Sequence, residues 1–115
     1  MKPENKNFQA RSWFKELKFY EREIRNCERS LEEVLQRARN VKDQVRAEQF
    51  QNQFILQRLH LQQLWKQLRE ALNLPDKHQE VAYAKALDYR RFFKQLLREF
   101  DQFLHEYFAI PQLKV

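Results

Sequence analysis

The sequence predicts an all-α protein, an antiparallel three-helix bundle of long coiled-coil-like helices. Glycine is absent, and the only prolines are Pro3, Pro75 and Pro111, so two long stretches lack the residues that helix interiors exclude. Apolar residues recur at alternating steps of four and three, which is the spacing of helices packed lengthwise against one another. With 43% hydrophobic residues, the chain is too apolar to be disordered, and residues 1–115 are expected to form a single domain.

The first predicted helix spans residues 8–39 and carries an unbroken apolar seam. The seam consists of Trp13, Leu17, Tyr20, Ile24, Cys27, Leu31, Val34 and Ala38, and the same spacing continues through Val41 and Val45. Cys27 is the only cysteine. Because it occupies a seam position, we expect a buried thiol that packs as a small hydrophobe and is not reactive.

The second predicted helix, residues 43–73, repeats the spacing in a different register, at Phe50, Phe54, Leu61, Leu64, Leu68 and Ala71. The change of register predicts a break at residues 40–43. Asn40 can end the first helix in a left-handed cap, and Asp43 can cap the second. Neither residue is an obligatory helix breaker. The alternative is therefore a long helical hairpin whose first helix runs unbroken to residue 73 and which dimerises into a four-helix bundle.

The third predicted helix spans residues 77–108. Asp76 and Gln79 have the spacing of a capping box at its start, and Pro111 is expected to stop the helix. Its seam is Ala82, Ala86, Tyr89, Phe93, Leu96, Phe100, Phe103, Tyr107 and Ile110, and it is flanked by Phe92, Leu97, Leu104 and Phe108. This wide apolar face predicts contact with two neighbours. The three helices, each roughly 48 Å long at the standard rise, can pack with flush ends.

The residue patterns of catalytic, metal and cofactor sites are missing, so we expect no enzyme activity, no bound metal and no cofactor. Bundle proteins build such sites from polar residues on their seams, and these seams are almost wholly apolar. His60, His78 and His105 are too scattered to form a zinc site with Cys27. The absence of glycine excludes the usual phosphate-binding loops.

No targeting or membrane-spanning segment is recognised. No apolar run approaches the roughly 20 residues that cross a bilayer, and the first residues lack the pattern of a secretory signal. We therefore expect a cytoplasmic protein that does not bind membranes.

The first predicted helix has a basic ridge on the side opposite its seam, formed by Arg11, Lys15, Lys18, Arg22, Arg25 and Arg29. A shorter stripe on the third helix consists of Arg91, Lys94 and Arg98. With a net charge of +6, these cations could bind a polyanion, and nucleic-acid binding is the alternative function. Glutamates interleave with the ridge at residues 16, 21, 23 and 28 and weaken its field, so a solvated surface is the favoured interpretation.

The leading hypothesis is a non-enzymatic protein–protein interaction module, acting as a scaffold, adaptor or small chaperone. Phe8 and Phe19 lie off the first seam and are candidate partner-binding residues, whereas Phe14 is expected in the core. The middle helix is rich in glutamine, at residues 44, 49, 51, 53, 57, 62, 63 and 67. Because a polar face without fixed charge is easier to desolvate, this helix could face a protein partner or, in a homodimer, a second copy of the chain.

Overall fold

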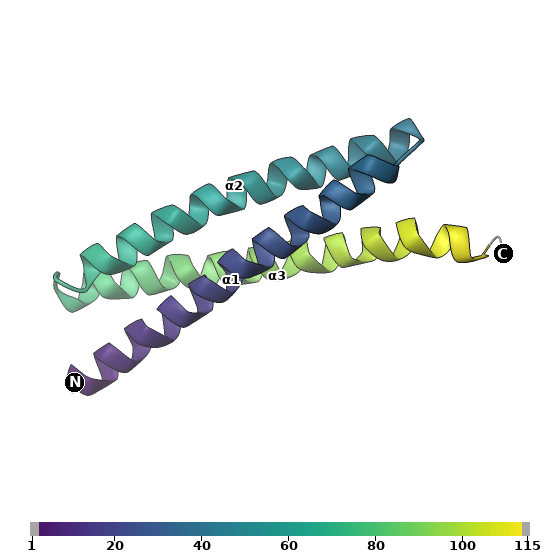
Figure 1. Ribbon diagram of the computed structural model, residues 1–115. Helices are drawn as coiled ribbons and strands as arrows, with labels where there is room; N and C mark the ends of the chain where they lie inside the picture. The colour runs from purple at the N-terminus through teal and green to yellow at the C-terminus, as the bar shows by residue number, and fades with distance from the viewer. Residues whose placement is uncertain (1–2, 114–115) are drawn as a thin grey trace.

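The computed structural model of the protein describes the backbone of residues 3–113 and the side chains of residues 9–108. The described backbone forms three helices, α1 (Pro3–Arg37), α2 (Val41–Ala71) and α3 (Asp76–Leu113). They run up, down and up, so that α2 is antiparallel to both of the others (Figure 1). The described part is a rod of 61 × 22 × 17 Å. This architecture confirms the predicted three-helix bundle.

The turn between α1 and α2 lies at residues 38–40 and differs in detail from the prediction. Asn40 is not a left-handed cap, since its φ of −101° and ψ of 152° are extended and it is the N-cap of α2. Its side-chain oxygen accepts a hydrogen bond from the backbone N–H of Asp43 at 2.8 Å, and its amide donates to the Asp43 carboxylate at 2.9 Å. Asn40 takes this position because it satisfies a backbone donor that a helix start leaves free.

The seam that appears continuous in the sequence ends at this turn. Ala38 is buried, whereas Val41 is 73% exposed and Val45 is also exposed. Beyond the turn α2 buries a different set, including Ala47 and Phe54. Val41 and Val45 continue the spacing along the sequence. However, α2 begins at residue 41, and both side chains lie on its solvent-exposed side. The chain therefore folds back at Asn40, and the long-hairpin alternative does not describe this structure.

The helix ends also differ from the predicted boundaries. α1 begins at Pro3 instead of residue 8, because proline is well suited to the first turn of a helix. α3 begins at Asp76 instead of residue 77 and continues past Pro111 to Leu113. The prediction that Pro111 stops the helix is wrong, because Pro111 lies within the last turn of α3, where its missing N–H removes one backbone hydrogen bond without ending the helix. Between α2 and α3, the Gln79 amide donates to the carbonyl oxygen of Leu74 at 3.3 Å.

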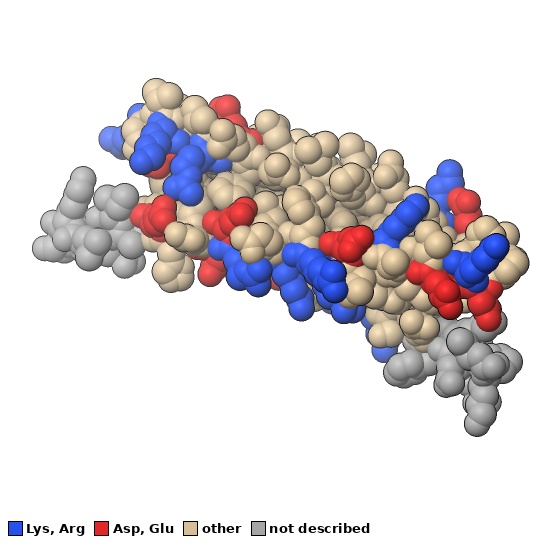
Figure 2. All heavy atoms as spheres, turned by 180° about the vertical axis from the view of Figure 1, so that it is seen from behind, with Lys and Arg blue, Asp and Glu red and all other residues tan. Residues whose placement is uncertain are grey.

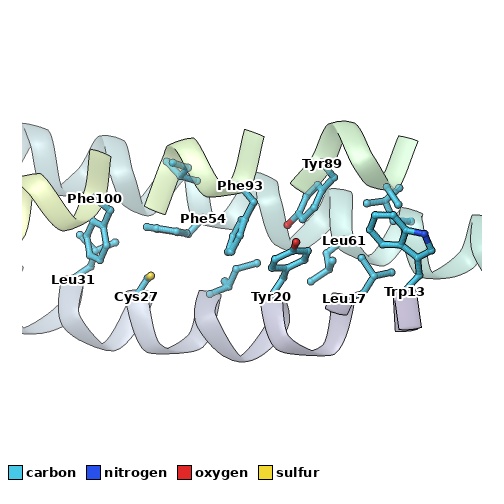
Figure 3. Packing of buried hydrophobic residues seen from close by; sticks show 14 of the residues in the cluster. Trp13, Leu17, Tyr20, Cys27, Leu31, Phe54, Leu61, Tyr89, Phe93 and Phe100 are labelled. Carbon is cyan, nitrogen blue, oxygen red and sulfur yellow. The ribbon is translucent and has the colours of Figure 1, made fainter. Parts of the chain in front are cut away.

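The seams of all three helices meet in one core (Figure 3). Tyr20 of α1 packs against Phe93 of α3 with their ring centroids 4.9 Å apart. Phe54 of α2 packs edge-on against Phe100 of α3 at 5.2 Å. Each helix therefore contributes large side chains to a common core.

Cys27 lies in this core, as predicted. Burial, together with the nearby carboxylates of Glu23 and Glu28, raises the pKa of its thiol to about 12. The reactive species is the thiolate, and at neutral pH the Cys27 thiol is protonated.

Candidate protein-interaction surface

The basic ridge of α1 is exposed along its whole length. Arg11, Lys15, Lys18, Arg22, Arg25 and Arg29 all lie at the surface. Arg25 forms an ion pair with Glu21 at 3.1 Å, and the Arg29 guanidinium donates a hydrogen bond to the side-chain oxygen of Asn26. Arg25 also borders the groove between α1 and α2, together with Glu21 and Glu28. Acidic side chains therefore accompany the ridge on its α2 side.

The shorter stripe on α3 is exposed as well, with Arg91, Lys94 and Arg98 at the surface. Arg98 donates a hydrogen bond to the side-chain oxygen of Gln95 at 2.6 Å. It borders the groove between α1 and α3, which Glu23 and Asp101 also line. Because both neighbouring grooves contain carboxylates, neither stripe borders a purely positive groove.

Glu16, which the sequence places beside the seam where it can pair with the ridge or with a neighbouring helix, belongs to a polar cluster between α1 and α3 whose other members the sequence did not identify. The Arg90 guanidinium donates two hydrogen bonds to the Glu16 carboxylate, at 2.7 and 2.8 Å, and its central carbon lies 4.5 Å from the centre of the Trp13 ring. The Tyr20 hydroxyl donates to the same carboxylate. The only signal in the sequence was that Glu16 and Arg90 each adjoin a seam residue, Leu17 and Tyr89.

The titration behaviour of this cluster marks it as structural. Burial by itself raises the pKa of Glu16, but the hydrogen bonds from Arg90 and Tyr20 and the charges of Arg90 and Lys94 outweigh it, so the pKa is lower than usual. Burial, and then the hydrogen bond to Glu16, raise the pKa of Tyr20. At neutral pH the cluster is thus an ion pair with a neutral phenol, and it ties α1 to α3.

The off-seam aromatic residues of α1 have different environments. Phe14 was expected in the core; it is partly buried and packs against the core, where it stacks on Trp65 of α2 with their centroids 5.0 Å apart and an interplanar angle of 16°. Phe19 is 47% exposed. Its ring packs edge-to-face with that of Tyr20, with the two centroids 5.9 Å apart. Phe8 belongs to α1, but its side chain is outside the described residues, so the proposed Phe8–Phe19 patch stays a prediction.

The middle of α2 is unusual because it is almost free of charge. Between residues 49 and 65 the only charged residue is Arg58, which forms an ion pair with Glu28 of α1. Figure 2 shows a broad area without charged side chains over the middle of α2, between charged groups near its two ends. We call this area the uncharged face of α2, and it comprises Gln49, Asn52, Gln53, Ile55, Leu56, Leu59, His60, Gln62 and Gln63.

Large apolar side chains lie exposed within and beside this face. Leu59 is 52% exposed, and Ile55 and Leu56 are exposed as well. Phe92 of α3, 49% exposed, borders the groove between α2 and α3. The uncharged face therefore combines amide groups with apolar contact area.

The groove between α2 and α3 consists of two hollows, of about 760 and 340 Å³, that share Phe92 as a lining residue. Amide side chains line both hollows, among them Gln53 and Gln95 in the larger and Gln63 in the smaller. The Arg46–Glu106 ion pair, at 3.0 Å, joins α2 to α3 near the start of α2. A long, shallow, amide-lined groove thus adjoins the uncharged face.

Gln57 lies at the floor of the smaller hollow and at a seam position of α2. It is only 2% exposed, and its side-chain oxygen has no hydrogen-bond partner within the described structure. The Tyr89 hydroxyl donates instead to the backbone carbonyl of Gln57 at 3.2 Å. Polar residues on a seam reduce stability but restrict how helices can align, which fits a structural position for this amide.

Sites for metals are missing from the described residues, where no three His, Cys, Asp or Glu side chains come together as a possible ligand set. Within the same residues, no helix is long and apolar enough to cross a membrane. No family model matches the chain, and no curated protein or solved structure is significantly similar to it.

Proposed function

We propose that the protein is a non-enzymatic helical interaction module that binds another protein chain through the uncharged face of α2. The observation that carries this proposal is the uncharged face of exposed amides and leucines on a chain in which 33% of all residues are charged. Removing water from a charged side chain costs more than removing it from an amide, and charged residues are depleted from the cores of protein interfaces. The uncharged face is therefore the part of this surface that a partner can cover at the lowest cost.

The shape of the surface favours a helical partner. A helix that lies along a groove buries one apolar side chain about every turn, and Leu56, Leu59 and Phe92 offer exposed apolar contacts at the uncharged face and its groove. The amide groups around them can both donate and accept hydrogen bonds. A scaffold, an adaptor or a small chaperone would all use such a surface.

Site-specific photo-crosslinking in the cells that make the protein tests this proposal. A photoreactive residue at Leu59 is expected to give discrete protein adducts, whereas the same residue at Arg22 or Arg91 is expected to give few. Both control positions are exposed but lie on the charged stripes. Adducts that form equally from all three positions, or none from position 59, would contradict the proposal.

Nucleic-acid binding is a second candidate, supported by the exposure of every cation in the α1 ridge. It is weaker because Glu21, Glu23 and Glu28 line the neighbouring grooves. If it holds, the triple variant Lys18→Glu, Arg22→Glu and Arg25→Glu should lose both the binding of a labelled RNA or DNA and its salt dependence.

A further inference from the structure

The charge distribution restricts how two copies of this chain can meet. Each copy carries a net charge of +6, so contact through either basic stripe would oppose like charges. A symmetric dimer places the same patch of each protomer against itself. The amide groups of Gln and Asn are complementary to themselves, since each is both donor and acceptor. Among the surfaces described above, the uncharged face of α2 meets the requirement of self-complementarity.

We infer that two copies of the chain associate through the uncharged face of α2, with the two α2 helices antiparallel and Leu59 near the two-fold axis. The inference rests on the proposed function and names the partner as a second copy. Leu59 is more than half exposed and lies near the middle of the face, so that the two Leu59 side chains supply the apolar centre of the contact. Amide side chains surround them on both protomers.

The antiparallel arrangement follows from the charges at the ends of the face. In a parallel pair each residue opposes its own copy, so that Lys66 would face Lys66 and Glu48 would face Glu48. In an antiparallel pair centred on Leu59, Lys66 faces the neutral Asn52. Like charges directly opposite each other destabilise an interface. The antiparallel pair removes the contact between the two Lys66 side chains, although it places Glu48 opposite Glu70 at the ends of the face.

The size of the face indicates a weak dimer. Residues 49–65 form a strip roughly 26 Å long and about 10 Å wide. The strips on the two protomers together measure roughly 500 Å² and the neighbouring Phe92 adds to this, so the contact is smaller than the about 1,000 Å² of a stable specific interface. We therefore expect the dimer to dissociate on dilution.

Sedimentation equilibrium over a wide concentration range tests the association. The expected mass rises from 14.4 kDa toward twice that value with concentration. The variant Leu59→Lys is expected to remain at the monomer mass while its helical circular dichroism is unchanged, since the side chain is exposed. Phe19→Lys is the matched control, because it adds the same charge at an exposed apolar residue of α1, and it should still dimerise.

Two results would overturn the inference. One is a wild-type protein that remains monomeric throughout, and the other is a Leu59→Lys variant that associates as the wild type does. A Phe19→Lys variant that becomes monomeric while Leu59→Lys dimerises would move the interface to α1. A monomeric wild type that still forms Leu59 adducts with another protein in cells would leave the proposed function standing.

Engineered surface cysteines test the orientation of the two α2 helices. The native Cys27 is buried and so does not lie at the contact. In mild oxidised glutathione, Leu59→Cys is expected to form an intermolecular disulfide. A mixture of Asn52→Cys and Lys66→Cys proteins should crosslink, whereas Asn52→Cys alone should not, since only the mixed pair lies opposite in an antiparallel dimer. Efficient crosslinking of Asn52→Cys with itself would show a parallel pair and overturn the arrangement.

Discussion

Glu16 shows how a single side chain beside a seam can join two helices. Its carboxylate accepts three hydrogen bonds, two from Arg90 of α3 and one from Tyr20 of α1, and the Arg90 guanidinium covers the face of Trp13. Hydrogen bonds to charged groups are stronger than neutral ones. Because both partners of the ion pair are partly exposed, solvent reduces their contribution.

The variant Glu16→Gln is expected to lower the free energy of unfolding by about 1 kcal/mol at pH 7. The pKa of Glu16 is below its ordinary value of 4.5 in the folded protein. Its contribution is therefore fully present above that value and is lost as the pH falls through the lower, folded pKa. Urea denaturation at pH 7 and pH 3 should show a difference between wild type and variant that shrinks at pH 3.

Glu32→Gln is the matched control for this measurement, since Glu32 is exposed on the same helix. We expect it to change the free energy of unfolding by less than about 0.5 kcal/mol. If Glu16→Gln and Glu32→Gln have equal effects, or if the Glu16→Gln difference is the same at both pH values, the ion pair does not stabilise the bundle.

At the scale of the elements, the turn at Asn40 determines which residues each helix buries. Asn40 caps α2 through its hydrogen bond with the Asp43 backbone, and the Gln44 amide donates to the carbonyl oxygen of Ala38 at 3.1 Å. These two contacts stabilise the reversal between α1 and α2. Without the reversal, Val41 and Val45 would extend the seam of α1, and the chain would expose that seam to a second molecule.

The variant Asn40→Ala is expected to destabilise the protein by about 1 kcal/mol, because it removes the cap of α2, whereas Asn40→Gly should cost only a few tenths. Urea denaturation measures both. Arg39→Ala, one residue earlier and exposed, is the control and should have little effect. An Asn40→Ala variant as stable as Arg39→Ala would show that the cap does not stabilise the turn.

At the scale of the whole molecule, the three helices depend on one shared core. Phe54 of α2 is completely buried and contacts Phe100 of α3, while the neighbouring seam residues contact α1 and α3 together. Since no helix has a core of its own, the described bundle should unfold in one cooperative transition.

The variant Phe54→Ala is expected to lower the free energy of unfolding by about 3–5 kcal/mol, because it leaves a cavity in this core. Phe92→Ala removes the same atoms from a half-exposed site and should cost much less. Thermal denaturation followed by circular dichroism and by tryptophan fluorescence compares the two variants. Equal losses would contradict a core centred on Phe54, and transitions that differ between the two probes would contradict a single cooperative unit.

The sequence by itself determined the helical class and most of the buried faces. Leu17, Ile24 and Val34 of α1 and Phe93 and Phe103 of α3 are buried where their spacing predicted. The reason is local, since the position of a residue around a helix depends only on its place along the chain. The exposure of the basic stripes followed from the same rule.

Only the tertiary structure decided where the chain turns and which partners meet across helices. The spacing of Val41 and Val45 favoured a continuing seam, and the cap of Asn40 favoured a new helix. Because local preferences are weak, the packing of α2 and α3 onto α1 settled the choice. Glu16 and Arg90 meet across 74 residues. Among the glutamines, Gln57 is buried while Gln63 is exposed. Each of these outcomes depends on how the helices are rotated against one another, which no local pattern specifies.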